Sequence, residues 1–490
     1  MSSLADSSSP RKTIYLDGNG TTPVFPEAIA AIKDSLTECF GNPSSSLTPL
    51  GRDAAARVAS ATSSVLTHIF GYGSADPSVV ELIWTSCGTE SNMTAIRIAL
   101  AMPRPPSSVP LFKFQPHVVT QNTEHPAILA PLLALSSSKQ IALTVLPVSP
   151  VTGVVTASDV LAALRPDTVL VSIMSANNES GVVFPVGDIA DKVKRRYPHV
   201  LVHTDAAQAC GKVLLHCAAT GENSPLRNVD LITIVGHKIG GPKGVAALLV
   251  NYLPSSVPPE GSSETWVSSP LFGIKAQMSG KGVFLQGGGQ ANGWRGGTEN
   301  VAYIEGVGEC ARKIGNKSDV AYVDPSLGAN RHMLSVKESI LDGVKAGLGS
   351  DSYGGDFVLH CKSGGMPILP NTLSVGFGGG VDSGVAIHHL ANPGDVGRPS
   401  EAAVVCSAGS ACLQLHKVED PSTRPYSAVL KAYGVGPDVG VGTLRISAGW
   451  WNTVEEAFEG GALIGKEVRR QRMFKAEEAK NTEEKMKNSL

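Results

Sequence analysis

Two neighbouring apolar runs in the middle of the chain end in side chains that could do chemistry together. VLVHTDA ends beside Asp205, with Gln208 three residues later, and LITIVGHK ends in His237 and Lys238 before a glycine-rich turn. If both runs are parallel strands, these side chains meet at the carboxyl edge of the sheet, where α/β proteins bind ligands. A lysine at the end of a buried strand either pairs with a carboxylate or loses its proton and becomes a nucleophile. The segment alone leaves both possibilities open.

A third run of residues could supply a site for an anion. ELIWTS continues into CGTESN, which puts Gly88 and Thr89 at the start of a helix, where free backbone N–H groups suit a phosphate. An ordinary capping turn would explain the same residues. No glycine–lysine pair of the chain is followed by Ser or Thr, which excludes a nucleotide-binding P-loop. An acidic residue, a nucleophilic lysine and a phosphate cup together match pyridoxal 5′-phosphate, with Lys238 forming the Schiff base and Asp205 keeping the pyridine nitrogen protonated.

The cysteines point to one candidate nucleophile and to no metal site. Cys412 follows the small residues SAGSA and precedes a polar, turn-prone stretch, so its thiol could reach a bound substrate; the alternative is a small buried side chain. Cys406, at the end of an apolar run, fits that alternative better. None of the eight cysteines forms a C-x-x-C pair, which argues against a disulfide framework and a structural zinc site. The His388–His389 pair has no metal-ligand pattern beside it, and we expect a structural role.

Short apolar runs alternate with helical patterns and define the elements that would position these residues. The runs are rich in Val and Ile, as expected for strands covered on both faces. Strands are predicted over 81–86, 117–121, 141–148, 168–176, 200–206, 231–237 and 245–250. Helices are predicted over 27–39, 52–70, 89–100 and 126–135. Such alternation predicts an α/β architecture with a largely parallel sheet.

After about residue 298 the pattern changes to that of a smaller α+β domain. Helices are predicted from about 300 and over 331–348, and strands over 371–377, 402–408 and 443–448. We therefore expect a large cofactor-binding α/β domain over 27–303 and a small α+β domain formed by 13–26 and 304–475. A disordered tail over 1–12 and a charged tail over 476–490 complete the chain. The long irregular segment 254–281 could be a lid or disordered.

Composition limits the class of protein and its partners. The 490 residues include 41 basic and 43 acidic side chains, so the formal charge of −2 gives no reason to expect nucleic-acid binding. No apolar run approaches the roughly 18 residues that a membrane helix needs. The first residues lack the apolar core of a secretory signal. We expect a cytoplasmic enzyme that has no membrane partner, with mitochondria left open as a location.

Ten motifs occur in the order found in the cysteine desulfurase and selenocysteine lyase family. They are YLDGNGTTPV, FGNPSS, CGTESN, TEH, ANNESG, HTDAAQACGK, GHKIGGPKG, RGGTEN, SAGSAC and LRIS. The resemblance spans about residues 15–468. It implies a fold-type I pyridoxal-phosphate enzyme of the class V branch, built as a homodimer with active sites shared between the subunits.

The resemblance also implies a role for each matching residue. Catalysis would fall to Lys238, Cys412 as the persulfide-forming nucleophile, and His125 stacked on the cofactor ring. Lys238, Asp205, His125 and Asn178 would contact the cofactor, and Gln208 would bond its ring oxygen. The phosphate would be held by Gly88, Thr89 and His237, and by Thr298 from the neighbouring subunit. The substrate would be bound by Arg445 through its carboxylate, by Asn178 and by Asn42.

Several positions depart from the family pattern and concern the substrate more than the cofactor. The family's DNNATT is DGNGTT here, which changes the segment from Asp17 to Thr22. Cys87 replaces a glycine of the phosphate turn, Val235 stands where many desulfurases have a phosphate-binding serine, and Gly240 replaces a bulky residue after GHK.

The resemblance implies cleavage of a C–S or C–Se bond in cysteine, selenocysteine or a close derivative, giving alanine and a persulfide on Cys412. A sulfur-acceptor protein could then collect the sulfur. One alternative is a β-lyase that eliminates from an S-substituted cysteine or a cysteine sulfoxide, giving pyruvate and ammonia. A remote alternative is a non-catalytic scaffold.

Overall fold

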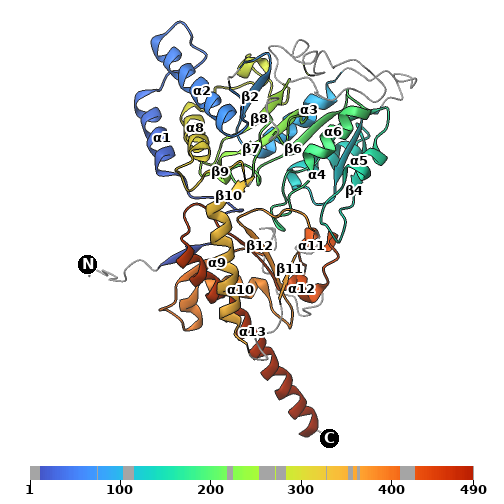
Figure 1. The fold of residues 1–490 in the computed structure, drawn as a ribbon, viewed down its shortest axis with the longest axis vertical. Coiled ribbons are helices and arrows are strands. Elements are labelled where there is room, and N and C mark those ends of the chain that lie inside the picture. Colours follow the sequence, from blue (N-terminus) through green and yellow to red (C-terminus); the bar gives the residue numbers. More distant parts are fainter. Residues whose placement is uncertain are drawn as a thin grey trace.

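The computed structural model describes residues 12–73, 76–102, 115–217, 224–252, 271, 283–326, 328–350, 357–360, 365–408 and 425–488. Cys412, residues 1–11 of the predicted tail and nearly all of the 254–281 segment lie outside these residues. The described chain builds a large α/β body and a smaller group of helices and strands below it (Figure 1).

A seven-stranded sheet forms the centre of the large body. Its strands are β2 (Val80–Thr85), β3 (His117–Gln121), β4 (Ala142–Leu146), β5 (Thr168–Ser172), β6 (Leu201–Asp205), β7 (Leu231–Val235) and β8 (Ala246–Asn251). They lie in the order β2-β8-β7-β6-β5-β3-β4, and β8 alone runs antiparallel to both of its neighbours. The predicted α/β class with a mostly parallel sheet is confirmed.

Both faces of this sheet are covered, which explains the nearly continuous apolar runs. Along β7, Leu231 belongs to one buried cluster and Ile232 to the other. The helices of this body are α1 (Pro26–Glu38), α2 (Pro49–His68), α3 (Gly88–Leu100), α4 (Pro126–Ser137), α5 (Ala157–Ala163), α6 (Val186–Arg196) and α8 (Val301–Gly315). Helices α3 and α4 supply apolar side chains to one cluster, α6 to the other, while α1 and α2 pack against α8.

The smaller part has its own apolar cluster around an antiparallel sheet. The sheet has the order β11 (Phe357–Leu359), β12 (Thr372–Phe377) and β14 (Thr443–Ser447), and β1 (Thr13–Tyr15) pairs in parallel with β13 (Ala403–Val405) nearby. A short hairpin is formed by β9 (Val323–Asp324) and β10 (Ala329–Asn330). The helices are α9 (Arg331–Leu348), α10 (Ser383–Ala391), α11 (Ala428–Ala432), α12 (Pro437–Val441) and α13 (Val454–Asn488).

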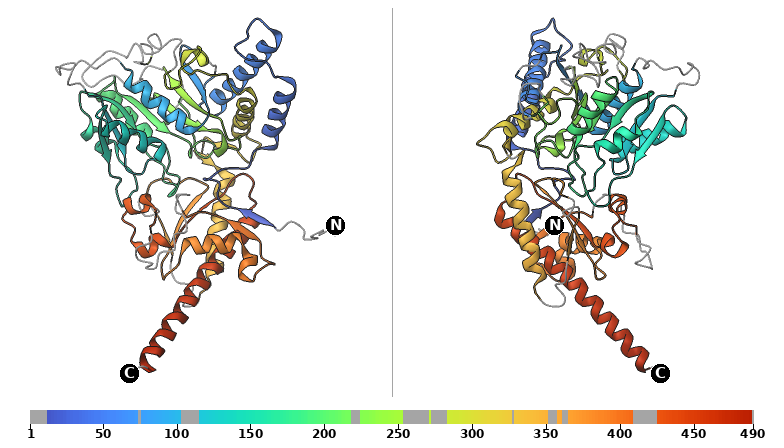
Figure 2. Two further views of the ribbon diagram at one scale, coloured as in Figure 1. Left: turned by 180° about the vertical axis from the view of Figure 1, so that it is seen from behind. Right: turned by 45° about the vertical axis from the view of Figure 1, so that its right-hand side comes forward.

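Helix α13 is the last element of the described chain and has 35 residues. It continues through the charged run predicted as a tail, as far as Asn488, and its last part projects away from the body in every view (Figures 1 and 2). Helix α9 lies along its first part. None of the helices in the described ranges is long and apolar enough to cross a membrane.

Candidate active site

Lys238 lies in a short 3₁₀ turn, Gly236–Lys238, that directly follows β7. Its Nζ donates hydrogen bonds to the backbone carbonyls of Asn19, at 2.6 Å, and Gly20, at 2.7 Å. Burial and then the cationic Arg445 lower the pKa of Lys238 to about 8. Nearby carboxylates act in the opposite direction without restoring the usual value. Of the two possibilities left open by the sequence, the structure favours the amine that can lose its proton.

Asp205 ends β6, the strand next to β7, and is held by neutral donors. Its Oδ2 accepts a hydrogen bond from the amide of Asn92 at 2.7 Å, and its Oδ1 accepts one from the backbone N–H of Ala207 at 2.9 Å. The residue is 8% exposed. Such a carboxylate can still pair with a cationic ring nitrogen. Asn92, within the CGTESN motif, is a site residue that the sequence reasoning missed.

A buried network joins Gln208 to Lys238 through Asn19. The Gln208 amide nitrogen donates to the Asn19 carbonyl at 3.0 Å, the same oxygen that accepts from Lys238. Lys212 Nζ donates to Gln208 Oε1 at 2.8 Å and to Asn19 Oδ1 at 3.0 Å. Burial, with Lys238 and Arg445 nearby, lowers the pKa of Lys212 well below its usual value. Asn19 and Lys212 lie within quoted motifs, but no sequence signal singled them out.

His125 precedes α4 and caps it, because its Nδ1 accepts a hydrogen bond from the backbone N–H of Ala127 at 3.1 Å. The residue is exposed to solvent, yet the protein around it lowers the pKa of the His125 ring by desolvation. Asp205 raises and Lys238 lowers the same pKa, which shows that all three groups share one electrostatic environment. The lowered pKa favours the neutral form of the His125 ring.

The start of α3 forms an open N-terminus beside the end of β7. Cys87 precedes the helix and gives it no side-chain cap, and Thr89 is exposed. A Cβ added to Gly88 would lie 2.7 Å from a methyl group of Val235, so glycine is what allows the helix to begin this close to the strand. Backbone N–H groups at such a helix end suit a phosphate.

His237 directly precedes Lys238, and its surroundings favour the neutral imidazole. Its Nδ1 lies 3.1 Å from Thr21 Oγ1. Burial and the neighbouring Lys238 lower the pKa of His237 to about 4. Gly240, which replaces a bulky residue of the family pattern, has a φ of +86° and leaves no space for a side chain, because the ring of Phe25 occupies it.

Arg445 comes from β14 and brings the smaller part of the molecule to the site. Its side chain is buried, and one Nη donates to the Asp17 carboxylate at 2.5 Å. The other Nη donates to the Asn178 carbonyl at 3.3 Å. Its Nε is buried and has no hydrogen-bond partner among the described residues. The guanidinium therefore keeps one donor free for a carboxylate.

Two predicted site residues, Asn42 and Thr298, have no contact with this cluster among the described residues, and a third cannot be placed. Asn42 lies exposed in the turn between α1 and α2, where its side chain accepts from the N–H of Ser44. Thr298 is exposed just before α8, and its role toward a neighbouring subunit stays a prediction. Cys412 lies outside the described residues. Cys406 is buried, and burial raises its pKa to about 12, as expected for an inert thiol.

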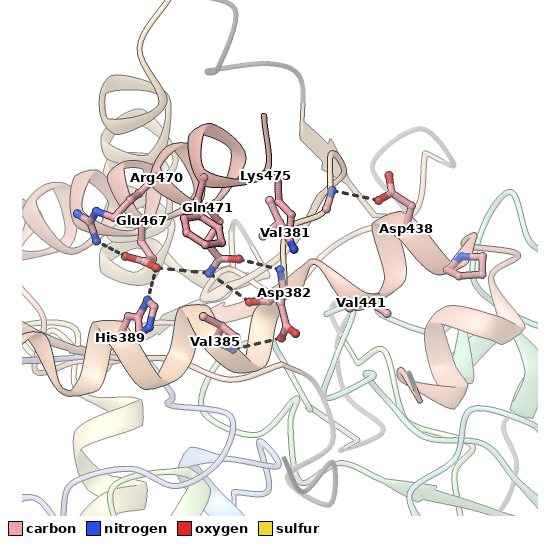
Figure 3. Close-up of a pocket in the computed structure, with 13 residues that line it drawn as sticks. Val381, Asp382, Val385, His389, Asp438, Val441, Glu467, Arg470, Gln471 and Lys475 are labelled. Carbon is pink, nitrogen blue, oxygen red and sulfur yellow. Dashed lines mark hydrogen bonds and ion pairs between the residues drawn. The ribbon is translucent and has the colours of Figure 1, made fainter. Parts of the chain in front are cut away.

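No group of side chains in the described part of the chain could hold a metal ion. His389 instead bonds Glu467 at 2.7 Å, beside a pocket of about 720 Å³ between α10, α12 and α13 (Figure 3). The buried Glu467 carboxylate is also paired with Arg398 and Arg470. None of the predicted site residues lines this pocket. The candidate active site is therefore the Lys238 cluster, where the titratable groups converge.

Comparisons with known proteins show the family of this chain. The family model described as Aminotransferase class-V matches residues 14–337. The chain is 33% identical to the selenocysteine lyase of Bos taurus over 472 residues, which cover 93% of each chain. It is 32% identical to the cysteine desulfurase of Trichormus azollae, over 95% of this chain and 96% of the relative. The chain is also similar to the solved structure of a NifS-like protein, with a TM-score of 0.67 and 26% identity. The matched region covers 94% of this chain and 99% of that protein.

Proposed function

Because the chain belongs to the class-V aminotransferase family, we propose that it binds pyridoxal 5′-phosphate at Lys238 and cleaves the C–S or C–Se bond of cysteine, selenocysteine or a close derivative. The products would be alanine and a persulfide on Cys412. The observation that carries this proposal is a half-buried lysine at the end of β7, whose pKa is lowered to about 8 and which interacts electrostatically with Asp205 and Arg445. The relatives named selenocysteine lyase and cysteine desulfurase support the same substrate class.

The residues fit the cofactor. An electron-withdrawing pyridinium ring, joined through its aldehyde to Lys238, would weaken the bonds at the substrate α-carbon. Asp205, which already accepts two neutral hydrogen bonds, would hold the proton on the ring nitrogen. The amide of Gln208 would donate to the ring oxygen, and His125 would cover the face of the ring. The open start of α3, at Gly88 and Thr89, would bind the phosphate.

Side chains of the protein would then bind the substrate and carry out the proton and sulfur transfers. Arg445 would bind the α-carboxylate, and Lys238 Nζ, released by the substrate amine, would take the α-proton and return it. Cys412 would attack the substrate sulfur as a thiolate, which breaks the C–S bond and moves the sulfur to the enzyme. An acceptor protein would remove that sulfur, and a homodimer would complete the site through Thr298.

Product analysis tests this function. We expect the purified protein to convert L-cysteine into alanine and to release sulfur in the presence of a thiol. Lys238→Ala should abolish both, and Cys412→Ala should abolish sulfur release. Cys39→Ala is the control. It alters a buried cysteine that the proposed mechanism does not use, and it should leave the products unchanged. If pyruvate dominates and Cys412→Ala stays active, the protein is an eliminating β-lyase instead.

A further inference from the structure

The hydrogen bonds of Arg445 leave its carboxylate-binding face half filled. A guanidinium binds a carboxylate best through two parallel N–H donors, such as Nε together with the adjacent Nη. Here Asp17 accepts from one Nη only, at 2.5 Å, and the buried Nε has no partner among the described residues. The Arg445 side chain is 6% exposed and that of Asp17 is 22% exposed. The acid is therefore the partner that has room to leave.

The backbone around Asp17 is fixed, so only its side chain is free to move. The Asp17 carbonyl accepts hydrogen bonds from the hydroxyl of Tyr15 at 3.2 Å and from the N–H of Gly20 at 2.9 Å. The N–H of the next residue, Gly18, donates to the Ser447 carbonyl at 2.8 Å. A rotation of the carboxylate away from Arg445 would break none of these bonds.

Gly20 provides the space in which the Asp17 carboxylate lies. A Cβ at position 20 would collide with Oδ2 of Asp17. The family pattern DNNATT has alanine at this position, whereas this chain has glycine. The position of the Asp17 carboxylate against Arg445 therefore depends on Gly20, at which this chain differs from the family pattern.

Charge explains what this arrangement does. A buried guanidinium without an anion is costly, and Asp17 neutralises it while no substrate is present. A substrate carboxylate can replace Asp17 without changing the local charge and can fill both donors. We propose that Asp17 is a specificity-determining residue, whose carboxylate occupies Arg445 until the α-carboxylate of an amino-acid substrate displaces it.

This inference rests on the proposed function. It predicts that in two variants Asp17 competes less strongly with the substrate carboxylate for Arg445. Asp17→Asn removes the competing charge, and Gly20→Ala pushes the carboxylate out of its position. Each should lower the Kd for L-alanine and the KM for L-cysteine by about three- to tenfold, with kcat within about twofold of wild type. The double variant Asp17→Asn/Gly20→Ala should have the same Kd for L-alanine and the same KM for L-cysteine as Asp17→Asn, because Gly20 acts only through the Asp17 carboxylate.

Binding can be followed without turnover by the change in absorbance of bound cofactor on titration with L-alanine. Ethylamine, which lacks the carboxylate, is the matched probe, and its Kd should be the same in wild type and variants. Asp188→Asn, at an exposed acid on α6 paired with Lys192, and Gly73→Ala, where a Cβ meets open space, are the control variants. Both should leave the two Kd values unchanged.

An equal or higher Kd for L-alanine in both Asp17→Asn and Gly20→Ala would overturn the inference. So would an equal change in the Kd for ethylamine, because the effect would then not concern the carboxylate. Failure of the proposed function would give a different result: the wild-type protein would bind no cofactor, and both proposals would then be wrong.

Discussion

Lys238 is an amine whose surroundings disfavour its charged form. Its two hydrogen bonds go to backbone carbonyls, and burial together with Arg445 lowers its pKa to about 8. An ordinary lysine has a pKa of about 10.4 and is almost wholly protonated at neutral pH. The structure therefore keeps a larger fraction of Lys238 than of an ordinary lysine as the neutral amine, which is the form that reacts with an aldehyde.

The pH dependence of cofactor attachment tests this environment. A lowered pKa means that the neutral, reactive amine is populated above about pH 8 and is lost as the pH falls below it. The rate at which cofactor-free protein binds pyridoxal phosphate, followed by absorbance, should rise with pH around a midpoint near 8. Arg445→Gln removes a neighbouring cation and should move the midpoint upward. A wild-type midpoint near that of free lysine would contradict the electrostatic argument.

At the scale of elements, the position of Arg445 depends on how the smaller part of the molecule is packed. Helices α9 and α13 approach closely because glycines face the opposite backbone. A Cβ at Gly461 would collide with the Ile340 carbonyl, and one at Gly347 with the Ala462 carbonyl. Neither backbone can move without displacing its helix.

Gly461→Ala should therefore destabilise the protein by about 1–3 kcal/mol, through overpacking at this helix contact. Denaturant unfolding, followed by circular dichroism, measures the effect. Gly73→Ala is the matched control, because the added methyl group meets no atom of the described residues beyond its chain neighbours, and its stability should stay close to wild type. Equal stability of Gly461→Ala and wild type would show that the two helices do not pack as described.

The sequence predicted most strands of the central sheet to within a few residues, because strands buried on both faces are nearly continuous apolar runs. It overestimated those that lead into the site. The strand expected over 168–176 ends at Ser172, and the one expected over 231–237 ends at Val235. Past Ser172 the chain is still apolar at Ile173 and Met174, although the strand has ended. Past Val235 the chain enters the 3₁₀ turn that carries His237 and Lys238.

At the scale of the whole molecule, the site combines residues of the large α/β body with residues of the smaller part. Asn19, 1% exposed, links them: its Oδ1 accepts from Lys212 of the large body, and its backbone N–H donates to Ser447 of β14. Lys238 and Asp205 could be predicted because residue type and strand end coincide. Asn19, Asn92 and Lys212 could not, because their roles arise only from contacts between segments far apart in the sequence.

One measurement tests the central claim most directly. The protein, saturated with pyridoxal phosphate, is treated with borohydride and digested, and its peptides are examined by mass spectrometry. We predict that the reduced cofactor is found on Lys238 and that Lys238→Ala leaves no labelled peptide. An unlabelled Lys238 peptide, or a label on the other buried amine of the network, Lys212, would contradict the account.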